Sequence, residues 1–306
     1  MKSGAILFIT AYNCDRYIEE CINSVYEQSF KDLFIILVDD FSSDQTFNVA
    51  AKTLNRLFPE NHKIIKNDEN IGKAGNAYIH LNGHDATFCA ILDGDDYLVD
   101  RDILREYYEQ YNLGYDVVWS SYRINDSRIS HETGSKALNP LKDPRSQIWM
   151  TSHFFSFRYE LFSNIPKKYF TDDNGFWLKS ACDQAIALPI LDQTRRYKFI
   201  NKVSYFYRTD NPQNHHNKDN LGQRVLTLNS ESQSQNSKIV YSKPPLPLKF
   251  TLQDIDFLYQ QFLDAQALSE ALNDTISVTL PVLFSILMNF KEQDKEAFED
   301  LLKLVG

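Results

Sequence analysis

The sequence predicts an α/β protein with a mostly parallel central sheet flanked by helices. Short apolar segments of strand length alternate with segments of helical period through about the first 110 residues. The apolar segments are nearly unbroken, which is typical of parallel strands buried on both faces. Polar segments end or follow the strands, and a parallel sheet gathers the carboxyl ends of its strands on one edge.

The first part of the chain supplies four strands and four helices in alternation. The strands are expected at residues 5–10, 33–38, 63–66 and 87–92. The helices are expected near residues 15–28, 44–54, 73–81 and 103–111. In the first helix, Ile18, Cys21, Ile22 and Val25 recur at helical spacing, which predicts one apolar face. Asp44 is placed to cap the second helix.

Beyond residue 115 the alternation weakens. Strands are expected at 116–122 and 197–207, and a short helix at 180–188 that Pro189 would end. Residues 229–237 are rich in Ser, Gln and Asn, so we expect a mobile linker within 226–250. Residues 251–306 are expected to form a C-terminal helical segment.

Composition excludes some classes of protein. The net charge of −9 argues against a nucleic-acid binder. The four cysteines form no C-x-x-C pair, which favours a reduced compartment. No signal peptide opens the sequence, and the apolar stretch 276–290 is short for a membrane span, so we expect a cytoplasmic protein.

An acidic cluster follows the fourth predicted strand. Asp93, Asp95 and Asp96 are separated only by Gly94, which permits a tight turn. Clustered carboxylates repel one another unless a cation lies among them, and oxygen ligands suit Mg²⁺ or Mn²⁺. An acidic β-turn without a metal explains the same residues. The cluster alone leaves both interpretations open.

Five segments together resemble the family 2 glycosyltransferases with the GT-A fold. They are T-A-Y-N at 10–13, S-V-Y-E-Q-S at 24–29, V-D-D-F-S-S-D-Q-T at 38–46, N-I-G-K-A-G-N at 70–76 and L-D-G-D-D at 92–96. The resemblance covers about 110 residues and thins beyond residue 120. It implies a Rossmann-like nucleotide-sugar-binding half at 1–115, an acceptor-binding half at 116–225, and inverting transfer of a sugar to a hydroxyl.

The resemblance also assigns a donor site. Tyr12 would stack on the base, Thr10 would contact its edge beside Asn13, and Asp40 would accept a hydrogen bond from the uracil N3–H. Lys73 would meet a phosphate or the base, although a solvated helix lysine is an equal alternative. We expect the donor to be a UDP-sugar.

The acidic cluster matches the D-x-D motif of the family. Asp93, Gly94 and Asp95 would contact the donor, and Asp95 and Asp96 would hold Mn²⁺ or Mg²⁺ against its diphosphate. A late Y-R segment suggests His215, or else His216, as a further ligand. His153 lies among aromatic residues, which favours packing or proximity to the acceptor over metal binding.

The general base of the family usually lies about 90 residues after the metal cluster. The segment A-C-D-Q at 181–184 falls there, so Asp183 is the expected base. The acid that normally precedes it is replaced by Cys182. Asp183 as a helix cap is the competing interpretation, and Asp172 and Asp173 are weaker candidates for the base.

The resemblance implies a glycan or lipid-linked acceptor and a role in surface-polysaccharide synthesis. Residues 251–306 carry 10 acidic and 3 basic side chains, which disfavours an anionic membrane surface. We expect them to pack on the core or form a homodimer, with at most peripheral contact at the inner face of a membrane. Two alternatives remain: a nucleotide-sugar-binding protein without transferase activity, and an aspartyl phosphotransferase, which normally places its D-x-D after the first strand.

Overall fold

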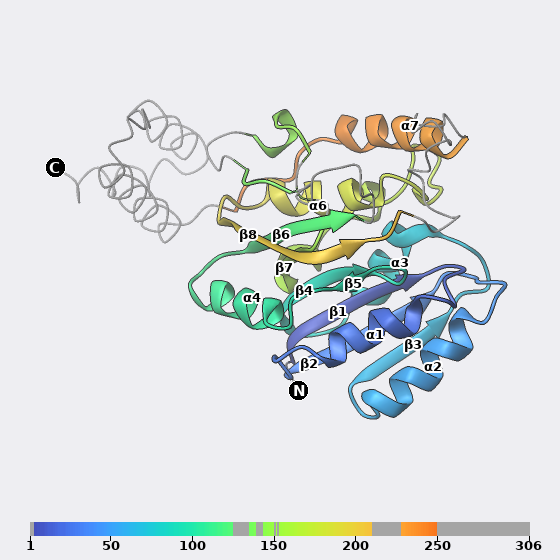
Figure 1. The fold of residues 1–306 in the computed structure, drawn as a ribbon. Coiled ribbons are helices and arrows are strands. Elements are labelled where there is room, and N and C mark those ends of the chain that lie inside the picture. Colours follow the sequence, from blue (N-terminus) through green and yellow to red (C-terminus); the bar gives the residue numbers. More distant parts are fainter. Residues whose placement is uncertain are drawn as a thin grey trace.

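The computed structural model describes residues 3–124, 135–138, 143–149, 151, 153–209 and 228–249. Eight strands form one sheet in the order β3-β2-β1-β4-β7-β6-β8-β5 (Figure 1). The strands are β1 (Ser3–Ala11), β2 (Leu33–Asp39), β3 (His62–Lys66), β4 (Ala86–Asp93), β5 (Tyr97–Leu98), β6 (Val117–Ile124), β7 (Phe155–Arg158) and β8 (Tyr197–Tyr207).

One half of the sheet is parallel, as the unbroken apolar segments predict. β1 pairs in parallel with both β2 and β4, and β2 pairs in parallel with β3. Thr10 lies opposite Val38 on one side and Asp93 on the other. The ends of β1, β2 and β4 therefore meet at one edge, where the polar segments were expected to gather.

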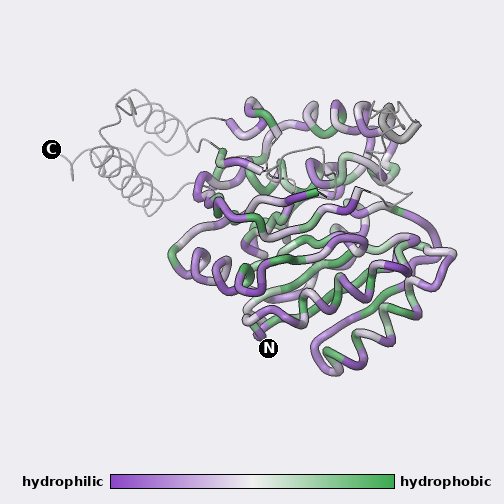
Figure 2. The backbone as a smooth tube through the Cα atoms, in the orientation of Figure 1, coloured by the Kyte–Doolittle hydropathy of each residue, from purple (hydrophilic) through white to green (hydrophobic). Residues whose placement is uncertain are grey.

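Helices cover both faces of the sheet. Leu7 and Ile9 of β1 pack towards α1 (Ile18–Tyr26), α2 (Thr46–Leu57) and α4 (Ile103–Asn112). Ile6 and Phe8 face the opposite layer, which contains α3 (Gly72–Leu81), α5 (Tyr159–Phe162) and α6 (Cys182–Asp192). Figure 2 shows the consequence as hydrophobic strands between helices whose outer sides are hydrophilic. Alternate strand residues thus fill two separate cores.

The other half of the sheet is mixed. β7 is antiparallel to both β4 and β6, whereas β6 and β8 are parallel to each other, and β5 is antiparallel to β8. Because β7 lies directly beside β4, the second half of the chain continues the sheet next to the strand that carries the acidic cluster. This arrangement brings residues 153–158 to the site, although they follow β4 by some 60 positions.

Two local predictions differ from the structure. Pro189 lies inside α6, which continues to Asp192. Proline costs one backbone hydrogen bond there, and the complete burial of the surrounding residues offsets this loss. The expected mobile linker contains α7 (Leu228–Ser242), which packs against α6, with Val240 buried. Tertiary packing here outweighs a polar composition.

The predictions for the C-terminal segment and for the late histidines cannot be compared with the structure. Residues 251–306, His215 and His216 all lie outside the described residues. Within the described ranges, no helix has the length and hydropathy needed to cross a membrane.

Candidate active site

The ends of β1 and β2 form the first part of the site. Tyr12, directly after β1, is 41% exposed, which leaves its ring accessible to a ligand. Asn13 has a φ of 47°, and its Oδ1 accepts hydrogen bonds from the backbone and hydroxyl of Ser43. Phe41 has a φ of 71° and is 50% exposed. Two exposed aromatic residues thus follow neighbouring strands at the same edge of the sheet.

The two acids at the end of β2 have different surroundings. Asp40 is buried, and its carboxylate accepts hydrogen bonds from the backbone N–H groups of Ile71 and Gly72 at 3.0 and 2.8 Å and from the Asn67 amide. It therefore caps the N-terminus of α3.

Asp39 is fully buried, and only its Oδ1 accepts a hydrogen bond, from the Ser42 backbone. Its Oδ2 has no hydrogen-bond partner. The acid with an unused oxygen is thus the neighbour of the one the sequence favoured. The two adjacent aspartates look alike in the sequence. Which of them accepts hydrogen bonds from α3 depends on where that helix begins.

The acidic turn after β4 is tightly enclosed. The Gly94 N–H donates to the Thr10 carbonyl at 2.8 Å. A Cβ added to Gly94 would lie 2.9 Å from the Ala11 Cβ and 3.0 Å from the Ile18 Cδ1. Any larger residue would push the turn away from β1 and α1, so glycine is required here for close approach.

Asp96 lies at the bottom of this turn and is 1% exposed. Its Oδ2 accepts from the Tyr205 hydroxyl at 2.6 Å and its Oδ1 from the Arg208 backbone at 2.7 Å. Burial, and then the charges of Asp95 and Asp93, raise the pKa of Asp96 well above its ordinary value. Asp96 therefore holds β8 and the residues after it against the acidic turn.

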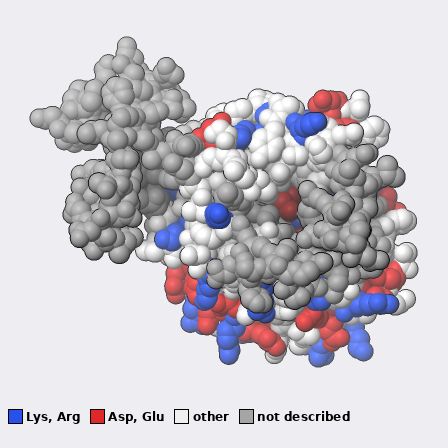
Figure 3. Space-filling view, turned by 45° about the horizontal axis from the view of Figure 1, so that its top comes forward, with Lys and Arg blue, Asp and Glu red and all other residues white. Residues whose placement is uncertain are grey.

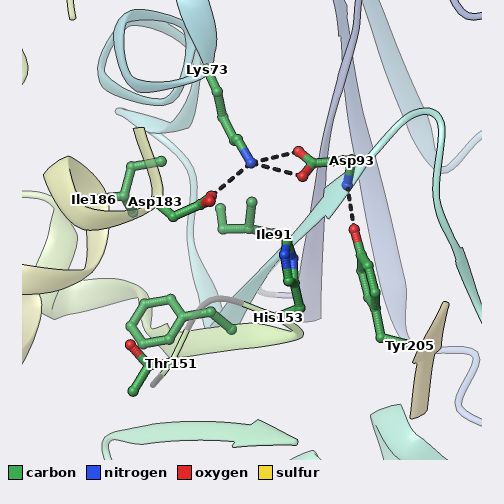
Figure 4. Close-up of a pocket in the computed structure, with 9 residues that line it drawn as sticks. Lys73, Ile91, Asp93, Thr151, His153, Asp183, Ile186 and Tyr205 are labelled. Atoms are coloured by element: carbon green, nitrogen blue, oxygen red, sulfur yellow. Dashed lines mark hydrogen bonds and ion pairs between the residues drawn. The ribbon is translucent and has the colours of Figure 1, made fainter. Parts of the chain in front are cut away.

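Lys73 connects the acidic turn to Asp183. It lies in the first turn of α3, and its Nζ is 2.6 Å from Asp93 Oδ1 and 2.7 Å from Asp183 Oδ1 (Figure 4). The lysine side chain is 16% exposed and those of Asp93 and Asp183 are 20% and 35% exposed. Burial opposes the charge of Lys73, but Asp183 and Asp93 raise its pKa well above the ordinary value.

These residues line one pocket between β4, β7, α3 and α6. Its polar side chains are Lys73, Asp93, Thr151, His153, Asp183 and Tyr205. Figure 4 shows Lys73, Asp93 and Asp183 grouped on one side, with His153 and Tyr205 beside Asp93. Thr151 is 1% exposed, and its hydroxyl has no hydrogen-bond partner. The space-filling view shows acidic side-chain atoms at the bottom of a hollow (Figure 3).

Cys182 does not line this pocket. Its thiol is buried and directed towards the Leu178 carbonyl. The residue before Asp183 therefore faces the core, and cysteine there leaves the lining of the pocket unaffected.

The rival acids have other partners. Asp172 accepts from the backbone N–H groups of Asn174 and Phe176 and so closes a turn. Asp173 is 87% exposed and pairs with Lys243. Neither lines the pocket that contains Asp183.

Among the described residues, one group has the composition of a cation site. Ligand atoms of Asp93, Asp96 and His153 lie within 4.8 Å of one another. Two carboxylates and one imidazole suit Mn²⁺ better than Mg²⁺, which prefers oxygen. Asp95 occupies the same turn outside this group, and His215 lies beyond the described residues.

The sequence around His153 favoured packing or proximity to the acceptor over metal binding. Its ring stacks with those of Tyr205 and Tyr207, at centroid distances of 5.1 and 4.7 Å. The aromatic surroundings that favoured packing are real, and they also hold the imidazole beside Asp93 and Asp96. Only the pairing of β7 with β4 reveals this position.

The chain is similar to known proteins over this same region. The family model described as "Glycosyl transferase family 2" matches residues 6–183, which reach from β1 to the candidate base. A chondroitin synthase of Pasteurella multocida is 27% identical over 207 residues, covering 65% of this chain and 20% of that protein. The chain thus spans about a fifth of the length of this relative.

Shorter matches involve other bacterial enzymes. The poly(ribitol-phosphate) beta-N-acetylglucosaminyltransferase TarS of Staphylococcus aureus is 31% identical over 108 residues, covering 35% of this chain and 18% of TarS. The Escherichia coli glucosyltransferase WfaP is 33% identical over 97 residues, covering 32% of this chain and 37% of WfaP.

The solved structures show the fold. The crystal structure of S. aureus TarS 1-349 in complex with UDP superposes with a TM-score of 0.54 at 22% sequence identity. It covers 68% of this chain and 60% of the TarS chain.

Proposed function

The chain belongs to glycosyl transferase family 2, and we propose that it is an inverting, metal-dependent glycosyltransferase that uses a UDP-sugar. The acceptor is a hydroxyl of a glycan or a lipid-linked saccharide in surface-polysaccharide synthesis. Named relatives support the donor and acceptor classes. The TarS structure is a complex with UDP, and WfaP is named as a UDP-Glc enzyme acting on a diphosphoundecaprenol-linked sugar.

One observation carries the proposal: Asp93 and Asp183 share the ammonium group of Lys73. The donor-side acid and the candidate base therefore face each other across one pocket. A single displacement needs a leaving group and a base on opposite sides of the reacting carbon, with the reacting groups held close together.

The base is assigned to Asp183. Its carboxylate lies in the first turn of α6, lines the pocket and is 35% exposed, so an acceptor can reach it. It accepts the proton of the acceptor hydroxyl as that oxygen attacks the anomeric carbon. The bond from this carbon to the diphosphate breaks with inversion, and the electron pair leaves with UDP.

The donor is held by the edge of β1, β2 and β4. Tyr12 stacks on the uracil, Thr10 and Asn13 border it, and the end of β2 supplies the acceptor for N3–H. The unused Oδ2 of Asp39 favours this residue for that hydrogen bond, whereas Asp40 holds α3 in place.

The diphosphate side is assigned to Asp93, Gly94, Asp95 and Lys73. Asp93, Asp96 and His153 would hold the cation, with Asp95 in the same turn. A bound divalent ion would neutralise negative charge on the departing UDP.

A titration tests the function. UDP should bind in the presence of Mn²⁺, and Asp95→Ala or Asp96→Ala should weaken that binding. A panel of UDP-sugars then identifies the donor by metal-dependent hydrolysis. Absence of UDP binding to the wild-type protein, with or without Mn²⁺, would exclude the proposal, whereas UDP binding without hydrolysis or transfer would favour a non-catalytic binding protein.

A further inference from the structure

The Lys73 ammonium group occupies the centre of the site. Its Nζ contacts both carboxylate oxygens of Asp93, at 2.6 and 2.8 Å, and Asp183 Oδ1 at 2.7 Å. An ammonium group has three hydrogens, so these three contacts use all of its donors. The lysine neutralises charge on the donor-side acid and on the base at the same time.

The same acid belongs to the candidate cation group. Asp93 lies with Asp96 and His153 within 4.8 Å, measured between ligand atoms. A divalent cation bound there would lie beside the positive charge of Lys73, and two cations that share one carboxylate repel each other. Lys73 and a bound cation would therefore compete for Asp93.

We propose that Lys73 is a displaceable internal cation that keeps Asp93 and Asp183 paired until the donor diphosphate draws its ammonium group away. The proposal rests on the glycosyltransferase function inferred above. A lysine suits this role because its charge sits on a flexible four-carbon stem and can change partners without movement of the backbone.

The position of Lys73 sets the order in which the donor and the cation bind. In the donor-free protein, Asp93 is engaged by Lys73, so the cation binds weakly. When a diphosphate arrives, its negative charge offers Lys73 a new partner, which releases Asp93 to the metal and Asp183 to the acceptor. The base thus becomes available only when a donor is present, which limits wasteful attack by water.

The test measures binding of Mn²⁺ alone, without nucleotide, by electron paramagnetic resonance of the free ion and by calorimetry. Lys73→Met removes the charge, and we expect it to tighten Mn²⁺ binding about tenfold or more, because a nearby positive charge is lost. Lys73→Arg keeps the charge and should bind Mn²⁺ as weakly as the wild type. Lys52→Met, an exposed lysine on α2, is the control for net charge and should change nothing.

Unchanged or weaker Mn²⁺ binding by Lys73→Met would overturn the inference. Lys73→Gln retains N–H donors without the charge. If Lys73→Met does not fold, the Mn²⁺ affinity of Lys73→Gln is compared with that of the wild type instead. A parallel titration with UDP separates the two proposals. If the wild type binds UDP with Mn²⁺ but Lys73→Met gains no Mn²⁺ affinity, only the role of Lys73 is wrong.

Discussion

Lys73 and Asp183 are separated by 110 positions in the sequence, yet their side chains form an ion pair of 2.7 Å. The lysine comes from the first turn of α3 and the aspartate from the first turn of α6. These two helices pack against each other on one face of the sheet. The contact joins a residue of the donor-side segments to the last residue that the family model matches.

Replacing Asp183 tests its assignment as the base. Asp183→Asn should lower transfer by about 10²- to 10⁴-fold, the usual contribution of a general base, without weakening UDP binding. Transfer is measured by UDP release and binding by calorimetry. Asp173→Asn is the matched control, since Asp173 is 87% exposed and lies outside the pocket. Retained transfer in Asp183→Asn would remove this residue from the role.

The acids at the end of β2 should separate into a ligand-binding and a structural residue. Asp39→Asn should weaken UDP binding about tenfold or more, because a hydrogen bond to a charged acceptor is lost. Asp40→Asn should instead destabilise the protein by about 1–2 kcal/mol through its cap on α3. Calorimetry with UDP and unfolding in urea measure the two effects. If Asp40→Asn weakened UDP binding and Asp39→Asn only lowered stability, Asp40 would again be the acceptor for the uracil N3–H.

The ion pair between Arg145 and Asp192 should contribute to stability away from the pocket. The guanidinium donates to both carboxylate oxygens at 2.8 Å, and the two side chains are 8% and 1% exposed. Arg145→Ala leaves a buried carboxylate without its partner and should cost about 3–5 kcal/mol of unfolding free energy.

A double variant distinguishes the pair from simple loss of packing. Replacing both residues by leucine removes the isolated charge and should recover a large part of the lost stability. Urea denaturation followed by circular dichroism measures each variant. Equal losses in the single and double variants would show that burial of an unpaired charge is not the cause.

Asp44 should make stability depend on pH. Partial burial opposes its ionisation, but hydrogen bonds from Thr46 and Asp15 outweigh this and lower the pKa of Asp44. A carboxyl group with a lower pKa in the folded state stabilises the protein above its unfolded pKa, about 4, and this contribution is lost as the pH falls further.

The corresponding variant is Asp44→Asn. Its deficit in unfolding free energy should be full near neutral pH and should shrink as the pH falls below about 4. Denaturation series at several pH values check this against the wild type. A deficit in unfolding free energy that stays constant below about pH 4 would show that the lowered pKa of Asp44 is not its cause.

The parallel half of the fold, and the edge at which its polar segments gather, could be predicted from the sequence alone. Unbroken apolar segments such as Ala5 to Thr10 can be buried only between two helical layers, and parallel strands necessarily place Thr10, Asp39 and Asp93 together. The acidic turn could be recognised because the spacing of Asp93, Gly94 and Asp95 is local. Asp183 was predicted as the base from a motif and its distance along the chain, and the structure places it in the same pocket as Asp93.

Which side chains meet could not be predicted from the sequence, because it depends on packing between distant segments. The partners of Lys73 and the position of His153 depend on α3 packing against α6 and on β7 pairing with β4, contacts between distant segments that no local pattern encodes. Which of Asp39 and Asp40 accepts hydrogen bonds from α3 depends on where that helix begins, about 30 residues later. The sequence specifies which functional groups are present, whereas the distances between them are set by the packing of helices and strands.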